Sequence, residues 1–431
     1  MIERSYHDIA IPSIESHTLV SPLNKGLANM KRPLSIAEIS ESKLNLLRED
    51  LSLPAAVLYE DFLVNNLTWM RQFAAAYGAK LAPHGKTTMA PKLFLRQLQT
   101  GAWGITLATA QQTRAAYEHG VRRVLMANQL VGKQNMAIIA DLLDDPDFEY
   151  FCLVDSATLA EQLGAFFRSR GKRLNVLIEL GVDGGRTGIR NPEQLDSLLA
   201  SLQGWRQSLI LCGIELYEGV LDDEESIRQF LQRAVAHTRE LATAECFARS
   251  PIILSGAGSA WYDVVAEELS QAKLGPPVEI VLRPGCYLTH DVGAYRKAQE
   301  RIHARNEVAR GMQSGLLPAL QIWAYVQSVP ESAKAIITLG KRDAAFDAGL
   351  PTPALRFRPG HAAPELAPST WQLTKMMDQH AYLRFEEGDD IRVGDMIGFD
   401  ISHPCLTFDK WRFIPIVNAR YDVIDVVQTF F

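Results

Sequence analysis

Lys86 is the residue of this 431-residue chain whose type and position best fit covalent chemistry. It closes the otherwise apolar segment 80–86 and is followed by a threonine. Most lysines are solvated surface residues. A lysine at the end of a buried strand can instead be desolvated, which lowers the pKa of its amine and frees it as a nucleophile. Lys86 is therefore a candidate for Schiff-base chemistry.

Two glycine-containing segments could hold a phosphate group. They are Ser255–Ser259 (SGAGS) and Arg283–Tyr287 (RPGCY), and each follows a short apolar run. Backbone N–H groups of a glycine-rich turn can approach a phosphate closely, and serine hydroxyls add donors. A flexible turn has the same composition, so the position of these segments among the strands must decide between the two interpretations.

A histidine and a cysteine two positions apart, His403 and Cys405, form a second candidate centre. On an extended strand, residues i and i+2 project from the same face, roughly 7 Å apart along the backbone. An imidazole and a thiolate on one face can bind a borderline-soft cation such as zinc. Most isolated His-x-Cys pairs are accidental, so the pattern alone is a weak signal.

Eight short apolar segments recur along the chain, with helical patterns between most of them. They are 80–86, 105–109, 124–128, 151–155, 175–180, 210–216, 252–255 and 280–282. Strands that alternate with helices predict a parallel sheet, and eight such units predict a closed (β/α)8 barrel. A doubly wound open sheet is the alternative. In a barrel, active sites lie at the carboxyl ends of the strands and phosphate commonly binds after strands 7 and 8, where both glycine segments fall.

The chain divides into three regions that differ in their pattern of predicted helices and strands. Residues 1–59 are predicted to be an N-terminal extension, in which 35–50 form one helix and 55–59 a strand that joins the C-terminal domain. The barrel is expected over 60–305. From 306 to 431, short strand-like runs alternate with Gly, Pro and Asp turns, which predicts an all-β domain that carries the His-x-Cys pair.

Composition argues against several classes of function. A net charge of −6 and a pI near 6.0 give no attraction to nucleic acid or to an anionic membrane. No apolar run reaches the roughly 18 residues that span a bilayer. The first thirty residues are polar, with Glu3, Asp8 and Glu15, unlike a signal peptide. Five scattered cysteines argue against a disulfide framework. We therefore expect a cytoplasmic protein that acts on a small molecule.

In combination, these motifs resemble the fold-type III pyridoxal-phosphate (PLP) enzymes, and within them the D-serine dehydratase/D-threonine aldolase family. The resemblance rests on the strand-1 lysine, the segment 185–188 (GRTG) and the two glycine segments, and it covers about residues 50–425. It implies an α/β fold with an alanine-racemase-like (β/α)8 TIM barrel and a C-terminal all-β domain. One departure concerns the lysine segment. The family pattern is Arg-Pro-His-x-Lys-Thr-His-Lys, whereas residues 82–89 read APHGKTTM, so three flanking polar positions on the substrate side differ.

The resemblance also implies roles for individual residues. Lys86 would carry PLP and move the Cα proton, Arg186 would lie near the cofactor's phenolic oxygen, and His84 and Tyr217 would line the pocket. The cofactor phosphate would be held by Ser255, Gly256, Gly258, Ser259, Gly285 and Tyr287. His403 and Cys405 would bind a catalytic divalent metal, zinc in the family's dehydratases, whereas the family's aldolases typically carry His-x-Asp at this place.

The activity expected from these features is β-elimination from a D-3-hydroxy amino acid, with D-serine giving pyruvate and ammonia. A metal-dependent D-threonine aldolase is the first alternative. A racemase is the second, and it would need a second base opposite Lys86 but no metal pair. A non-catalytic PLP-carrier protein is the third, although the long segment after the barrel disfavours it. A homodimer is expected, because relatives with this two-domain plan usually close the barrel mouth with the partner's β-domain.

Overall fold

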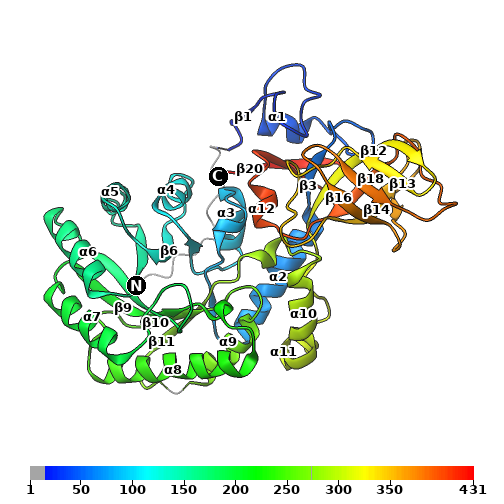
Figure 1. The fold of residues 1–431 in the computed structure, drawn as a ribbon. Helices are drawn as coiled ribbons and strands as arrows, with labels where there is room; N and C mark the ends of the chain where they lie inside the picture. The colour runs from blue at the N-terminus through cyan, green and yellow to red at the C-terminus, as the bar shows by residue number, and fades with distance from the viewer. Residues whose placement is uncertain (1–14, 273) are drawn as a thin grey trace.

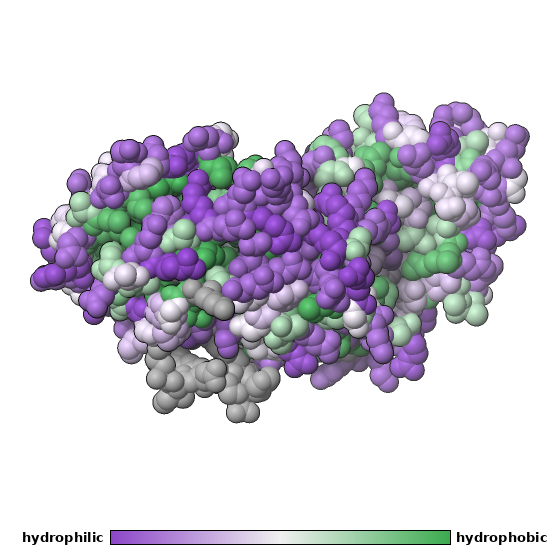
Figure 2. All heavy atoms as spheres, turned by 90° about the horizontal axis from the view of Figure 1, so that it is seen from below, coloured by the Kyte–Doolittle hydropathy of each residue, from purple (hydrophilic) through white to green (hydrophobic). Residues whose placement is uncertain are grey.

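In the computed structural model, residues 15–272 and 274–431 are described, and they form a barrel beside a domain of antiparallel strands (Figure 1). Glu3 and Asp8, on which the expectation of no signal peptide partly rests, lie outside the described residues, as do the first fourteen residues of the predicted extension. Among the described residues, no helix is both long and apolar enough to cross a bilayer. Figure 2 shows hydrophilic residues over most of one face, with hydrophobic residues in small groups between them.

Eight parallel strands form one sheet in the order β4-β11-β10-β9-β8-β7-β6-β5. The strands are β4 (Lys80–Leu81), β5 (Ile105–Leu107), β6 (Arg123–Gln129), β7 (Glu149–Val154), β8 (Leu174–Leu180), β9 (Leu209–Leu216), β10 (Ile252–Gly256) and β11 (Val278–Leu282). β4 pairs with β11 on one side, and the chain after β4 pairs with β5 through the parallel bridge His84–Thr106. The sheet therefore closes on itself, which confirms the predicted barrel over the open sheet.

Alternation of side chains along the barrel strands separates two apolar layers. In β7, Phe151 and Leu153 belong to an inner cluster, whereas Tyr150, Cys152 and Val154 belong to the large cluster shared with the surrounding helices. The inner cluster also contains Leu177, Cys212 and Ile253, all of which are buried. Successive side chains on a strand point to opposite faces, so a barrel strand that is covered on both sides must be apolar throughout.

Helices between the strands cover the barrel, as Figure 1 shows. They are α2 (Glu60–Ala76), α3 (Pro91–Gln99), α4 (Ala110–Glu118), α5 (Lys133–Leu142), α6 (Ala157–Ser169), α7 (Pro192–Gly204), α8 (Glu224–Thr243) and α9 (Tyr262–Gln271), followed by α10 (Ala294–Arg305) and α11 (Glu307–Gly311). Several of these helices begin at a residue whose side chain accepts a hydrogen bond from a free backbone N–H of the first turn. Ser156, Asn191 and Asp223 cap α6, α7 and α8 in this way.

The C-terminal region is built from short antiparallel strands. They are β12 (Leu320–Glu331), β13 (Lys334–Ile337), β14 (Thr352–Phe357), β15 (Glu365–Leu366), β16 (Gln372–Met376), β17 (Ala381–Arg384), β18 (Met396–Asp400), β19 (Phe413–Val417) and β20 (Val423–Gln428). The N-terminal strand β3 (Ala55–Tyr59) pairs with β12 and β19, so the chain enters the barrel from within this domain. One short helix, α12 (Cys405–Phe408), lies between β18 and β19.

The prediction of one helix over residues 35–50 is wrong. A two-stranded ribbon of β1 (Leu19–Val20) and β2 (Leu34–Ser35) precedes α1, which covers only Ile36–Glu41. Ser35 and Glu38 begin this helix with a reciprocal capping box. Lys43 and Glu49 then adopt positive φ angles of 56° and 60°. This left-handed conformation cannot continue an α-helix, so the chain proceeds in turns.

The inner barrel cluster gives a prediction on stability. Leu177 is fully buried in β8, so Leu177→Ala should lower the free energy of unfolding by about 2–5 kcal/mol through lost burial and a residual cavity. Leu23 is 93% exposed, and Leu23→Ala should change it by less than about 0.5 kcal/mol. Urea unfolding followed by tryptophan fluorescence measures both, and equal midpoints for the two variants would contradict the packing described above.

Candidate active site

A cavity of about 180 Å³ opens at the carboxyl ends of the barrel strands, where the β-domain approaches. Nine of the twelve residues proposed from the sequence line it: His84, Lys86, Arg186, Tyr217, Gly258, Ser259, Gly285, His403 and Cys405. Ser255, Gly256 and Tyr287 do not. The cavity therefore brings the lysine, a glycine loop and the His-x-Cys pair to one place.

Lys86 does not close a strand, because β4 ends at Leu81; it lies beyond that strand in a single 3₁₀ turn, Gly85–Thr87. Its side chain is exposed to the cavity, while its neighbours Gly85 and Thr87 are buried. A Cβ at Gly85 would lie 2.7 Å from the ring of Phe94 in α3, so only glycine lets the turn pack this closely. The turn is thus held by the helix behind it, and it presents the exposed lysine side chain to the cavity.

His84 is held neutral beside the lysine. Burial lowers the pKa of its imidazole well below the usual range, and the positive charges of Lys86 and Arg283 lower it further. Its Nδ1 atom is buried and has no hydrogen-bond partner among the described residues. A buried polar atom without a partner is costly, so this nitrogen is available to a group that enters the cavity.

Arg186 reaches the cavity from a loop that is fixed at both ends. Ile189 pairs with Leu180 at the end of β8, and the Thr187 hydroxyl donates to Glu179 Oε1 at 2.6 Å. Gly188 has a φ of +95°, and a Cβ there would lie 2.5 Å from the Leu180 carbonyl carbon. The Arg186 guanidinium lies over the Tyr217 ring, 5.5 Å from its centroid. The loop therefore presents one cation and one aromatic ring together.

A buried ion pair between Arg283 and Glu215 lies under the cavity, and its arginine also donates a hydrogen bond to Ser255. Arg283 donates to Glu215 and to the Ser255 hydroxyl, the latter at 3.1 Å, and Ser255 donates in turn to the Val281 carbonyl at 3.0 Å. Burial raises the pKa of Glu215 to about 7, although the Arg283 guanidinium opposes the shift. Ser255 therefore supports an arginine from inside the barrel and does not face the cavity.

The glycine loop after β10, the seventh barrel strand, already donates hydrogen bonds to an acidic side chain. The N–H groups of Ala257 and Gly258 donate to the buried carboxylate of Glu218 at 3.1 and 2.6 Å. Ser259 Oγ accepts from the N–H groups of Gly285 and Cys286 at 3.2 and 3.1 Å, which joins the loop after β10 to the loop after β11. These loops are built to bind an anion, but a phosphate would need Glu218 to turn away before it could reach the first pair of donors.

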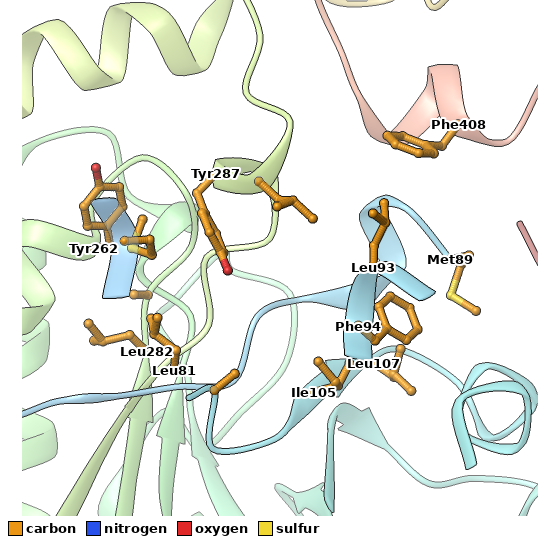
Figure 3. Packing of buried hydrophobic residues seen from close by; sticks show 14 of the residues in the cluster. Leu81, Met89, Leu93, Phe94, Ile105, Leu107, Tyr262, Leu282, Tyr287 and Phe408 are labelled. Carbon is orange, nitrogen blue, oxygen red and sulfur yellow. The ribbon is translucent and has the colours of Figure 1, made fainter. Parts of the chain in front are cut away.

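Tyr287 and Gly256 have different places from those the sequence predicts, whereas Gly285 lines the cavity. A Cβ at Gly285 would lie 2.6 Å from the His84 carbonyl oxygen, so this residue lets the two loops touch. Tyr287 is buried in the hydrophobic core (Figure 3), and its hydroxyl accepts from Gln97 in α3 at 3.1 Å. Gly256 is buried against Val265. Neither Tyr287 nor Gly256 lines the cavity.

The His-x-Cys pair is not on an extended strand, which corrects the geometric argument made from the sequence. His403 lies in the loop after β18, and Cys405 is the first residue of α12, after Pro404 in the right-handed helical region. His403 Nδ1 bonds Asp347 Oδ2 at 2.7 Å, and Cys405 Sγ lies 3.4 Å from Thr87 Oγ1. The β-domain therefore touches the residue next to Lys86.

The charges of this pair are coupled. A hydrogen bond from Cys286 lowers the pKa of Cys405 to about 4, assisted by His403. Hydrogen bonds to Cys405 and Asp347 raise the pKa of His403 to about 9. The pair is thus an imidazolium and a thiolate, and both side chains can bind metal once the histidine loses its proton. Within the described part of the chain, no three His, Cys, Asp or Glu side chains are already gathered as a metal site.

Five cavity residues with polar or ionisable side chains were not proposed from the sequence: Thr87, Asn128, Arg283, Cys286 and Tyr295. Asn128 ends the third predicted strand, so a search of every strand end would have found it. Arg283 and Cys286 lie within the second glycine segment, where attention fell on the glycine and tyrosine. Tyr295 lies in α10, beyond the last barrel strand, and no local pattern marks it.

Comparison with known proteins agrees with this geometry. A sequence model described as the alanine racemase N-terminal domain matches residues 60–275, and a model of a serine dehydratase domain matches residues 319–417. The first match alone covers just over half of the chain. The chain belongs to the alanine-racemase-like, fold-type III family of PLP proteins.

Curated relatives of this fold-type III protein act on hydroxylated D-amino acids, as their names state. D-threo-3-hydroxyaspartate dehydratase of Delftia sp. is 27% identical over 246 residues, 56% of this chain and 62% of the relative. D-threonine aldolase of Arthrobacter sp. is 24% identical over 49% of this chain and 56% of the relative. 3-Hydroxy-D-aspartate aldolase of Paracoccus denitrificans is 25% identical, with 70% and 75% covered. The chain thus spans about three fifths of the first two relatives.

Solved structures match over nearly the whole chain. D-threonine aldolase from Filomicrobium marinum has a TM-score of 0.74 at 21% identity and covers 90% of this chain and 97% of its own. The Delftia dehydratase has a TM-score of 0.69 at 21% identity, with 90% and 99% covered. At this identity the likeness shows the fold. Two further structures of that dehydratase are variants in which a histidine, or a cysteine two positions later, is replaced by alanine, the second in a metal-free form.

The cavity residues fit the cofactor of this family on three observations. An exposed lysine offers an amine, the unpartnered His84 Nδ1 offers a contact, and two joined glycine loops supply N–H groups that can bind an anion. Lys86 and Arg186 give the cavity positive charge that suits a phosphorylated, phenolic ligand.

Gly285 provides a test of how tightly these loops must pack. Gly285→Ala would place a methyl group 2.6 Å from the His84 carbonyl and 2.9 Å from Thr87 Oγ1, which should displace the lysine turn. Overpacking of this kind costs about 1–3 kcal/mol, or about 5- to 150-fold weaker PLP binding. Gly204→Ala, where no atom lies within 4 Å of the new Cβ, is the matched control. Titration of the cofactor-free variants with PLP, read by absorbance, should separate the two, and equal affinities would contradict the prediction.

Proposed function

We propose that this fold-type III protein is a PLP- and metal-dependent lyase that catalyses β-elimination from a D-3-hydroxy amino acid, converting D-serine to pyruvate and ammonia. One observation carries the proposal. The thiol of Cys405 lies 3.4 Å from the hydroxyl of Thr87, directly beside Lys86. The residues able to hold a metal therefore lie next to the residue able to hold PLP, which is the arrangement that removal of a 3-hydroxyl requires.

Lys86 has two parts in this proposal, to hold the cofactor through its amine and to move the Cα proton. PLP, when bound, supplies an electron sink for the charge that develops on Cα. His84 is uncharged and leaves the lysine as the local base. Arg186, above the Tyr217 ring, would face the cofactor's phenolic oxygen. Ser259, Gly258 and Gly285 would orient the phosphate from the far side of the cavity.

His403 and Cys405 would hold the divalent metal, and zinc is the ion that an imidazole and a thiolate favour. Such an ion supplies Lewis-acid assistance to a poor leaving group such as hydroxide. Asp347, which bonds His403 Nδ1, leaves Nε2 for the metal, a common arrangement of metal-binding histidines. The His and Cys replaced in variants of the Delftia dehydratase have the same two-residue spacing, and one of those variants is metal-free.

The charge of the cavity bears on the substrate. Of the described residues that line it, the lysines and arginines are Lys86, Arg186 and Arg283, and Arg283 is already paired with Glu215. With Lys86 and Arg186 assigned to the cofactor, no unpaired lysine or arginine remains in this set for a substrate carboxylate, so each additional carboxylate on the substrate would add uncompensated negative charge. This balance favours a substrate with one carboxylate, such as D-serine, over the 3-hydroxyaspartate named for two of the relatives.

An aldolase is the second candidate, because two of the relatives named above are aldolases. The thiolate of Cys405, where the family's aldolases typically carry a carboxylate, favours elimination. The homodimer and the cytoplasmic location expected from the sequence stay predictions.

Lys86 gives the first test of this proposal. Borohydride treatment of the PLP-loaded protein should bleach its colour and fix the cofactor on the peptide that contains Lys86. Lys86→Ala should lower turnover by at least about 10²–10⁴-fold, because the proton-transfer group is lost. The side chain is exposed, so the melting temperature of the cofactor-free protein should not change. A label on another lysine would refute the assignment.

Metal removal gives the second test. Pyruvate formation from D-serine should fall by about 10²-fold or more on chelation and in Cys405→Ala, because leaving-group assistance is lost. Cys246→Ala, a partly exposed cysteine outside the cavity, should retain full activity. Pyruvate formed equally well without metal would remove the metal from the proposal. Glycine and acetaldehyde formed from D-threonine faster than pyruvate from D-serine would favour the aldolase.

A further inference from the structure

Cys286 is a buried cavity residue that the proposed function does not use. It begins the short turn η4 (Cys286–Leu288), which follows β11, the eighth barrel strand. Only 4% of its surface is exposed, and that part lines the cavity. Its Sγ atom lies 3.8 Å from Cys405 Sγ. The barrel therefore supplies a second sulfur beside the one that comes from α12.

The separation of the two sulfurs matches that of two thiolates on one ion. With Zn–S bonds of about 2.3 Å and a tetrahedral angle, two sulfur ligands lie about 3.8 Å apart. A disulfide would need a much shorter separation of about 2.05 Å. Two free thiols in contact would also lie at this distance, so the neighbours of the sulfurs must distinguish the cases.

Those neighbours favour two thiolates around a cation. Thr87 Oγ1 lies 3.4 Å from Cys405 Sγ and 3.7 Å from Cys286 Sγ, so one hydroxyl can donate to either sulfur. The Tyr295 hydroxyl also contacts Cys286. Two buried thiolates side by side would repel each other unless a metal ion neutralised them. The surroundings are thus polar enough for a second thiolate, provided that the metal of the proposed function is bound.

We propose that Cys286 is the third protein ligand of the metal, which gives a Cys₂His site with one position open to the substrate. This inference rests on the metal-dependent function proposed above. Catalytic zinc sites characteristically have three protein ligands and one open position. Since the described residues form no ready-made three-ligand group, the ion must draw His403 towards the sulfurs. His403 lies in an irregular loop with 27% of its side chain exposed, so its ring can turn. Binding would release two protons to solvent, one from Cys286 and one from His403.

The inference has a consequence for metal selectivity. Two thiolates and an imidazole are soft ligands, which favour Zn²⁺ over Mg²⁺, Ca²⁺ and Mn²⁺ more strongly than one thiolate and water would. A site with His403 and Cys405 alone would discriminate less. The barrel residue would thus set the choice of ion, while the β-domain residues provide the first two ligands.

The number of sulfur ligands can be measured directly in the PLP-loaded, zinc-loaded full chain. X-ray absorption at the zinc edge should report two sulfur neighbours in the unmodified protein and one in Cys286→Ala and in Cys405→Ala. Competition with a chromogenic chelator should show zinc binding at least about tenfold weaker in Cys286→Ala, in line with the 10- to 100-fold effects of disturbing a metal site. Cys246→Ala is the matched control and should keep two sulfurs. Circular dichroism of Cys286→Ser and Cys286→Ala tests folding.

The outcomes separate the two proposals. One sulfur in the unmodified protein, with zinc affinity unchanged in Cys286→Ala, would overturn the role of Cys286 and leave the proposed function intact. Zinc that binds at neither His403 nor Cys405 would overturn both. A disulfide between Cys286 and Cys405, found by non-reducing peptide mapping of protein purified in reductant, would also overturn the inference, because these sulfurs could not then bind metal.

Discussion

The contact of Thr87 with two sulfurs is the interaction on which the arrangement of the cavity depends. Thr87 follows the candidate lysine, Cys286 comes from the end of strand 8, and Cys405 comes 318 residues after Thr87 from the β-domain. Phe408, one turn further in α12, packs towards Leu93 in α3 (Figure 3). The lysine turn is therefore clamped between the last barrel strand and a helix of the other domain, so the two domains cannot separate without opening the site.

The connectivity explains how such a contact is maintained. Strand β3 begins in the β-domain, where it pairs with β12 and β19, and leads directly into α2 of the barrel. The chain returns to the β-domain only after the eighth barrel strand. Because the large hydrophobic cluster continues from the barrel helices into β12 and β18, the two domains share one core. A shared core restricts relative motion, which suits a site whose ligands come from both sides.

The general architecture could be predicted from the sequence because it rests on repeated signals. Eight apolar runs with helices between them fix the barrel, and Lys86, Arg186 and the His-x-Cys pair then follow from their positions at strand ends and from the family resemblance. The errors arise where side-chain direction matters. Ser255 faces Arg283 inside the barrel, and Tyr287 is turned by η4 towards Gln97. The helix expected over 35–50 ends early because Lys43 adopts a positive φ angle. A lysine side chain gives no indication of such a backbone conformation. The hydrogen bonds of Glu218 to the glycine segment depend on tertiary structure, and no local sequence pattern marks them.

Charge balance connects the glycine loops to the metal pair. Glu215 and Glu218 are both buried beneath the cavity, and burial raises the pKa of each carboxyl group. Glu218 now accepts from the N–H groups that a phosphate would need, so cofactor and carboxylate compete for the same donors. A dianionic phosphate would bind these donors more strongly than a single buried carboxylate can, and Glu218 can take up a proton when it is displaced. The opposite wall carries the thiolate of Cys405 and the imidazole of His403, where a divalent cation would be balanced. In the proposed function, the cavity would thus have an anion-binding side on the barrel and a cation-binding side on the β-domain, with Lys86 between them. A D-3-hydroxy amino acid joined to the cofactor would have its Cα beside Lys86 and its hydroxyl towards the cation-binding side. The bond placed for cleavage with metal assistance would then be the one between Cβ and oxygen.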